Sequence, residues 1–106
     1  MEDKMPYAYI QDVPANEHIY EQVKARLGDE PPKGLIAHLA VRRDGGLRYV
    51  DVWETQADWA RFREDRLEPA VRDVLAGMGI PFDRSQVRFE EIDVIDTWLA
   101  GHAVAR

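Results

Sequence analysis

Two alternating runs joined by a tight turn constrain this chain more than any other feature. Asp44-Gly45 is among the strongest short signals for a β-hairpin, and it stands between the runs 35–42 and 47–54. A loop of either two or four residues centred on Asp44-Gly45 gives the same register, and that register decides which side chains face each other. In that register His38 faces Asp51. The pattern therefore predicts an antiparallel pair of strands with a histidine beside a carboxylate.

Both faces of this hairpin are rich in side chains that avoid water. One face is aliphatic and carries Leu35, Ala37, Leu39, Val41, Val50 and Val52. The other is aromatic and polar, and it pairs Ile36 with Trp53, His38 with Asp51 and Ala40 with Tyr49. The helices of a small domain can cover only one face, and a large exposed apolar patch marks an interface. We therefore expect a homodimer that packs sheet against sheet.

The segments around the hairpin complete a βαββαβ order. Met5–Val13 predicts the first strand and Gln86–Ile95 predicts the last. Asn16 and Thr55 predict the N-caps of two helices, one on either side of the hairpin. Right-handed crossovers turn this order into a four-stranded antiparallel sheet with both helices on one face. The predicted class is α+β, with the ferredoxin-like arrangement.

Apolar residues recur at spacings of three and four in both predicted helices, which is typical of one buried face. The first helix has the stripe Ile19, Tyr20, Val23 and Leu27, and the second has Trp59, Phe62, Leu67, Val71, Val74, Leu75 and Met78. Pro69 lies inside the second helix and has no N–H to donate. It therefore predicts a kink or a split at that point.

The length of 106 residues predicts a single domain over 1–106, with a core of about 5–95 and a C-terminal tail of 96–106. The formal charge is −6, so neither nucleic acid nor an anionic membrane surface is an expected partner. Cysteine is absent, which excludes disulfides, thiolate nucleophiles and zinc ribbons. Neither a signal peptide nor a transmembrane run is expected, and the predicted location is cytoplasmic.

Pro32–His38, Asp44–Thr55 and Phe62–Ala70 together resemble the dimeric α/β-barrel superfamily, which is akin to the antibiotic-biosynthesis monooxygenases. The likeness covers about 5–95 and is most specific in Val50–Thr55. It implies that two ferredoxin-like protomers pair their sheets into a barrel, with ligand pockets between each sheet and its helices. Members include cofactor-free monooxygenases of aromatic polyketides, haem degraders, lactone isomerases and stress-responsive proteins. The resemblance therefore speaks to fold more than to reaction.

The haem-degrading branch of this superfamily can be compared residue by residue. Its members have an Asn near the end of the first strand, a Trp on the second helix and a haem-ligating His further along that helix. Gln11, Phe62 and Arg72 stand at those positions here, and no His occurs in 55–78. The resemblance does not extend to haem, and we expect no cofactor.

His38 and Asp51 are the predicted catalytic residues. A carboxylate beside an imidazole fixes its tautomer and raises its basicity, which suits it to work as a general base. The same pair also occurs as a cross-strand hydrogen bond that satisfies two polar groups inside an interface. A void of about 300 Å³ or more beside His38, open to solvent, would favour the enzyme or a ligand binder, whereas close packing would favour the structural role.

The predicted ligand-binding residues surround this pair with aromatic and amide groups. They are Tyr9, Gln11, Tyr49, Trp53, Trp59 and Phe62. Trp59 and Phe62 lie three residues apart on a helix, a spacing that is equally typical of core packing. Aromatic residues on the first strand are also often simply packed. Both interpretations remain open.

No metal site is predicted. Four acids lie in or just beyond the last strand, namely Glu90, Glu91, Asp93 and Asp96. A hard cation needs more convergent oxygens than these, so the acids favour a solvated edge strand that resists edge-to-edge pairing. The three histidines share no spacing typical of zinc ligands.

Two classes of function follow from the sequence. The first is a small-molecule enzyme resembling cofactor-independent monooxygenases that act on apolar aromatic, polyketide-like compounds, with an isomerase or cyclase on the same fold as a related reaction. The second is a non-catalytic homodimer that binds a small apolar or aromatic ligand or has a structural role. The residues alone leave the choice open.

Overall fold

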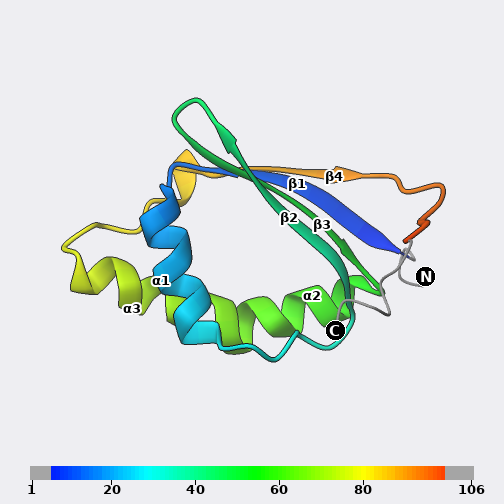
Figure 1. The fold of residues 1–106 in the computed structure, drawn as a ribbon, viewed down its shortest axis with the longest axis horizontal. Coiled ribbons are helices and arrows are strands. Elements are labelled where there is room, and N and C mark those ends of the chain that lie inside the picture. The colour runs from blue at the N-terminus through cyan, green and yellow to red at the C-terminus, as the bar shows by residue number, and fades with distance from the viewer. Residues whose placement is uncertain (1–5, 100–106) are drawn as a thin grey trace.

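The computed structural model describes residues 6–99. It shows a four-stranded antiparallel sheet with helices on one side (Figure 1). The strands are β1 (Tyr7–Val13), β2 (Leu35–Arg43), β3 (Gly46–Trp53) and β4 (Arg88–Ile92), in the sheet order β2-β3-β1-β4. This is the ferredoxin-like order, so the predicted α+β fold is confirmed. Met5 of the predicted first strand and residues 100–106 of the predicted tail lie outside the described residues.

The helix caps are those that the sequence predicts. Helix α1 (Glu17–Leu27) begins where the Asn16 side chain accepts a hydrogen bond from the Ile19 N–H at 2.8 Å. Helix α2 (Gln56–Phe62) begins where the Thr55 hydroxyl oxygen accepts from the Asp58 N–H at 3.0 Å. Both caps satisfy N–H groups that have no partner within the helix.

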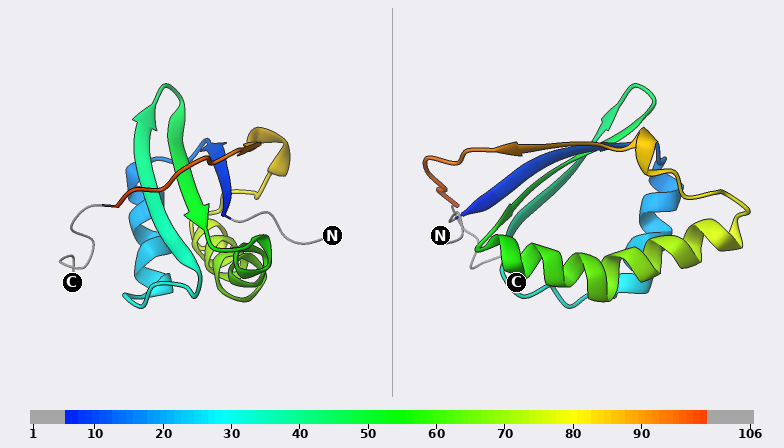
Figure 2. Two further views of the ribbon diagram at one scale, coloured as in Figure 1. Left: turned by 90° about the vertical axis from the view of Figure 1, so that its right-hand side faces the viewer. Right: turned by 180° about the vertical axis from the view of Figure 1, so that it is seen from behind.

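The second predicted helix is not split at Pro69. Helix α2 continues through a π-helical turn, Arg63–Leu67, into helix α3 (Glu68–Gly77), and the ribbon is continuous but curved along its length (Figure 2). The Glu68 N–H bonds to the carbonyl of Arg63, five residues back. The wider turn comes just before the proline, whose ring would crowd a carbonyl of a regular helix. The predicted interruption is therefore a widened turn.

The hairpin register is confirmed except at its first residues. His38 pairs with Asp51, and Ala40 with Tyr49, as expected. A β-bulge lies between Leu35 and Ala37, so that Leu35, not Ile36, pairs with Trp53. The expectations that Ile36 faces Trp53 and that Leu35 lies on the aliphatic face are therefore wrong. Leu35 packs against the aromatic core.

The last strand is shorter than predicted. β4 ends at Ile92, so Asp93–Ile95 do not extend the ladder with β1. Before the strand, a 3₁₀ turn covers Arg84–Gln86, and the Asp83 side chain accepts from the Ser85 N–H at its start. This local cap takes Gln86 out of the strand. β4 forms one edge of the sheet, as expected of an acidic segment.

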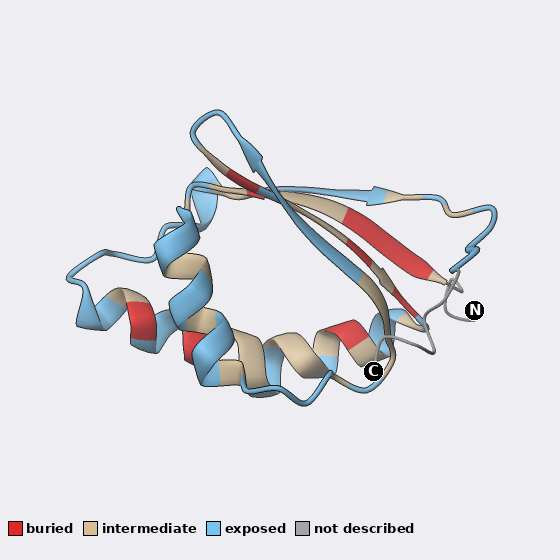
Figure 3. Cartoon of the chain, viewed as in Figure 1, coloured by how far each residue is buried: buried red, intermediate tan, exposed pale blue. Residues whose placement is uncertain are grey.

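The core lies between the aromatic face of the sheet and helix α2 (Figure 3). Tyr7, Tyr9, Trp53 and Trp59 are each at most 5% exposed, and Leu35, Phe62 and Leu67 pack against them. The helices therefore cover the aromatic and polar face. The aliphatic face stays open, with Leu39 59% and Val41 44% exposed. Within residues 6–99, no helix is both long and apolar enough to span a bilayer.

Trp59→Ala is expected to lower the free energy of unfolding by about 3–5 kcal/mol, because it empties the centre of the aromatic core. The exposed Gln56 of the same helix provides the control, and Gln56→Ala should change stability by less than about 0.5 kcal/mol. Urea denaturation followed by circular dichroism measures both. A Trp59 variant as stable as the control would contradict this location of the core.

Candidate functional site: a buried carboxylate and its histidine

The His38 and Asp51 side chains meet across strands β2 and β3. The distance from His38 Nδ1 to Asp51 Oδ1 is 2.6 Å. The Asp51 side chain is 7% exposed, whereas that of His38 is 29% exposed and remains reachable from solvent. A carboxylate accepts hydrogen bonds and cannot donate, so Nδ1 carries the proton. In the neutral imidazole the lone pair then lies on Nε2. The predicted pairing is confirmed, and its catalytic role stays a prediction.

The second carboxylate oxygen of Asp51, Oδ2, accepts two hydrogen bonds. Oδ2 accepts from the Tyr9 hydroxyl at 2.9 Å and from the Trp53 indole N–H at 3.2 Å. The carboxylate thus binds donors from β1, β2 and β3. A buried carboxylate with this many fixed donors is held in one orientation, and so is the imidazole bonded to it.

Tyr20 of helix α1 completes the group on the other side of the imidazole. Its hydroxyl lies 2.9 Å from His38 Nε2. Sequence reasoning placed Tyr20 in the apolar stripe of the first helix and did not assign it to the site. One signal in the sequence could have indicated this role. Tyr20 is the one residue with a hydroxyl in an otherwise aliphatic stripe, and the stripe faces the polar side of the sheet.

The predicted ligand-binding residues separate into two groups. Tyr49 lies against the imidazole, with ring centroids 5.6 Å apart. Tyr9 and Trp53, at 2% and 1% exposed, are donors to Asp51 inside the core and do not line an open pocket. The structure therefore brings these three residues to the predicted catalytic pair.

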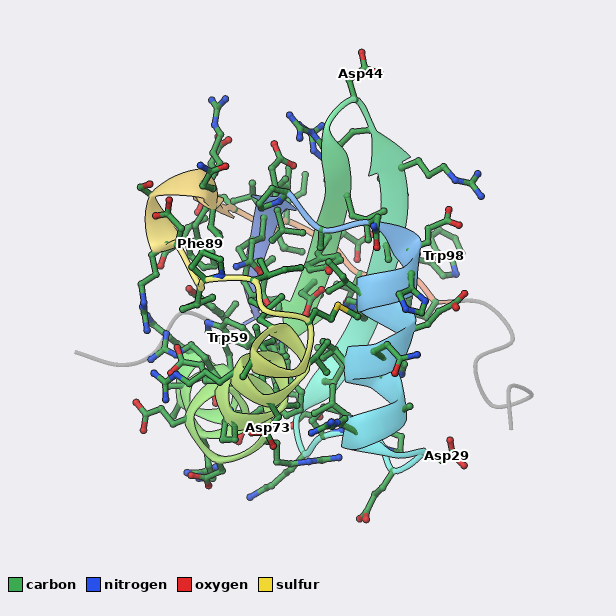
Figure 4. The ribbon with its side chains drawn as sticks, turned by 90° about the vertical axis from the view of Figure 1, so that its left-hand side faces the viewer. Asp29, Asp44, Trp59, Asp73, Phe89 and Trp98 are labelled. Atoms are coloured by element: carbon green, nitrogen blue, oxygen red, sulfur yellow. The ribbon has the colours of Figure 1, made fainter. Side chains whose placement is uncertain are left out.

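Three further predicted residues lie away from the imidazole. Trp59 and Phe62 contact Trp53 with ring centroids 5.6 and 5.5 Å apart, so both belong to the core or pack against it. Gln11 is half-buried on β1, between Tyr49 of β3 and Phe89 of β4 in the register. Phe89, labelled with Trp59 in Figure 4, packs against Tyr9 with ring centroids 4.7 Å apart. Packing accounts for Trp59 and Phe62, while a ligand role for any of the three stays a prediction.

The acidic residues around β4 do not converge. Glu90 and Glu91 occupy opposite faces of the strand, and Glu91 accepts from the Tyr7 hydroxyl at 3.0 Å. Within residues 6–99, no group of three or more His, Asp or Glu side chains is placed to hold a metal ion.

Hollows on the surface of the described residues include the following two. One of about 250 Å³ is lined by Glu17, Tyr20, Glu21, Ala40, Val41, Arg42 and Leu47. The other, of about 260 Å³, is lined by Glu30, Pro31, Pro32, Lys33, Asp58, Arg61, Phe62, Asp65 and Arg66. His38 lines neither hollow, but its hydrogen-bond partner Tyr20 lines the first. Neither of these two hollows is the void of about 300 Å³ or more beside His38 that would favour a ligand site, and the hydrogen-bonded group borders the first hollow through Tyr20.

No protein-family model matches the chain, and no curated protein matches it. Among solved structures, it is similar to the crystal structure of SnoaB, a cofactor-independent oxygenase from Streptomyces nogalater. The two are 14% identical with a TM-score of 0.47, over 93% of this chain and 98% of that one. A likeness at this level carries no conclusion about reaction, and the fold class rests on the strand order itself.

Burial raises the pKa of all four tyrosines of the chain. It raises the pKa of Tyr7 to about 12, with the hydrogen bond to Glu91 adding to the effect. It also raises the pKa of Tyr9, Tyr20 and Tyr49, and the charge of Asp51 adds to each shift. All four phenols therefore stay neutral in the folded protein at physiological pH.

Spectrophotometric titration should show less tyrosinate in the native protein than in the unfolded chain at pH 10.0, where an ordinary tyrosine is half ionised. The same chain unfolded in urea is the control and should titrate near that value. Because the folded pKa values are raised, the stability they contribute is complete below pH 10.0 and is lost as the pH rises toward about 12. A native midpoint near 10.0 would contradict the burial of these hydroxyls.

Proposed function

We propose that this protein is a small-molecule enzyme in which His38 acts as a general base and Asp51 holds it in the productive tautomer. The observation that carries the proposal is the 2.6 Å contact between Nδ1 and a carboxylate that is itself fixed by Tyr9 and Trp53. This contact leaves Nε2 as the basic atom. A positioned base of this kind accelerates proton transfer by about 10²–10⁴-fold.

The proposed reaction is cofactor-independent oxygenation of an enolisable or phenolic aromatic compound. The base removes a proton from an activated carbon, and the electron pair stays on the substrate as a resonance-stabilised carbanion. That carbanion reduces molecular oxygen. For a methylene conjugated to a ketone through aryl rings, one oxygen atom becomes the new carbonyl and the other leaves as water with both methylene hydrogens. The choice of oxygen as second substrate rests on the superfamily resemblance, whereas the base rests on the geometry.

An isomerase or cyclase would begin with the same proton abstraction and differ only in the fate of the carbanion. A non-catalytic role is favoured by one specific observation, since the Tyr20 hydroxyl already occupies Nε2 at 2.9 Å. Every donor and acceptor of His38 and Asp51 is then satisfied within the protein. A measurement of proton transfer itself, made without regard to oxygen, separates the catalytic proposals from this one.

The test uses anthrone, whose acidic methylene lies between two aryl rings and opposite a ketone. In deuterated buffer without oxygen, the wild type should exchange the methylene protons faster than buffer alone, as followed by NMR. His38→Ala should lose about 10²-fold or more of this exchange while keeping the wild-type circular dichroism. Oxygen uptake with the same compound then distinguishes an oxygenase from an isomerase. Exchange by His38→Ala at the wild-type rate would refute the base.

We also propose that the protein is a homodimer in which the open sheet faces pack together. Support comes from the aliphatic side chains on that face, where Leu39 is 59% and Val41 44% exposed. Val50 and Val52 are half-buried beside them. An apolar centre of this kind is costly in water and is typical of a stable interface. A second copy of the same face is the simplest partner, because a two-fold axis makes the surface self-complementary.

Leu39→Glu should convert the dimer to a monomer, because it places two carboxylates in the apolar centre of the pair. Ile80 is 40% exposed on the helical side, and Ile80→Glu is the matched control that should leave the dimer intact. Sedimentation at micromolar concentration measures both. A wild-type protein that sediments only as a monomer would overturn the proposed pairing.

A further inference from the structure

We propose that Tyr20 is the residue that meets the substrate, relaying its proton to His38, and that the substrate binds in the hollow between helix α1 and the β2–β3 hairpin. This inference rests on the proposed function, because it assigns the path by which the base acts. The proposed function names neither a second reacting residue nor a place for the substrate, and Tyr20 and the hollow supply both.

The basic nitrogen of His38 is already occupied by a hydroxyl of the protein. Asp51 fixes the proton on Nδ1, so Nε2 is the only basic atom of the neutral imidazole. The Tyr20 hydroxyl lies 2.9 Å from that atom, within ordinary hydrogen-bond distance. The ring planes of Tyr20 and His38 are within 5° of parallel. The phenol therefore already occupies the basic nitrogen, so a proton can reach Nε2 through the Tyr20 oxygen.

The Tyr20 phenol is neutral in the folded protein. Burial raises the pKa of Tyr20, and the charge of Asp51 raises it further. The hydroxyl therefore keeps its proton and donates it toward Nε2. Its oxygen still has a free lone pair that can accept a proton from another molecule. A neutral hydroxyl between a base and a substrate can pass a proton in this way without ionising.

The hollow of about 250 Å³ lies next to the Tyr20 side chain. Tyr20 is the residue shared by the hydrogen-bonded chain and the hollow of about 250 Å³. Ala40 and Leu47 supply apolar lining on the hairpin side. Glu17 and Arg42 form an ion pair with each other at the border, and Glu21 adds a carboxylate. This lining suits a small, largely apolar compound without a negative charge.

The step balances within these groups. The substrate C–H bond breaks and its proton forms a bond to the Tyr20 oxygen. At the same time, the Tyr20 O–H bond breaks and that proton forms a bond to His38 Nε2. The electron pair stays on the substrate carbon. Tyr20 ends neutral, and His38 ends as an imidazolium whose charge is balanced by Asp51.

The exchange assay with anthrone tests the relay by comparing two variants with the wild type. Tyr20→Phe removes the hydroxyl and keeps the ring. If Tyr20 relays the proton, this variant should lose about 10²-fold in kcat, as His38→Ala does, with KM nearly unchanged. Tyr7→Phe is the matched control, since Tyr7 bonds Glu91 outside this chain of groups, and it should retain the wild-type rate. Thermal unfolding of each variant checks the fold.

The outcomes are distinguishable. Loss of exchange in both Tyr20→Phe and His38→Ala supports the relay. A folded Tyr20→Phe variant that is as fast as the wild type, or faster, while His38→Ala is inactive overturns the relay and leaves the base standing. Exchange by His38→Ala at the wild-type rate, or no exchange by the wild type above buffer, overturns both proposals.

A third variant tests the binding site. Ala40→Leu narrows the hollow without touching a group of the hydrogen-bonded chain. It should raise KM for anthrone more than it lowers kcat, because it removes space for the substrate and leaves the reacting groups in place. An unchanged KM in a folded Ala40→Leu protein would overturn this placement of the substrate.

Discussion

The buried carboxylate of Asp51 is the interaction on which the rest of this structure depends. An unpaired carboxylate in a dry interior is costly enough to prevent folding around it, so its donors must be in place. His38, Tyr9 and Trp53 supply them from three neighbouring strands. The hydrogen bonds from His38 and Tyr9 require the observed register, because a slip of one residue would send either donor to the other face, whereas Trp53 lies on the same strand as Asp51. The polar group thus specifies the sheet as well as the site.

The same constraint explains which face of the sheet the helices cover. The donors to Asp51 are large aromatic side chains, and they bury most area when helix α2 brings Trp59 and Phe62 against them. The aliphatic side chains are left on the open face. At the hairpin end of that face Arg48 binds both oxygens of Asp12, at 2.7 and 3.0 Å, and this lowers the pKa of Asp12. The open face thus has an apolar centre beside the Arg48–Asp12 ion pair. We propose that a second copy of the chain covers this surface.

Parts of the site could be predicted because they depend on local rules. The pairing of His38 with Asp51 follows from a turn signal and a period of two, neither of which needs the rest of the chain. The bulge that makes Leu35, and not Ile36, the partner of Trp53 could not be predicted in this way. A bulge depends on how the end of the strand packs. Tyr20 was missed for a related reason. Its contact with His38 depends on how helix α1 docks, and helical spacing gives the buried face of a helix but not its partner.

The sequence by itself determined the order of the elements, the helix caps, the hairpin register and the presence of two apolar faces on one sheet. These features depend on residues that are close along the chain or paired across one turn. The tertiary structure decided which face is covered, that Tyr9 and Trp53 are donors in the core, and that Tyr20 occupies the basic nitrogen. These contacts join residues far apart in sequence, and their geometry is set only when the helices and the sheet pack into one core.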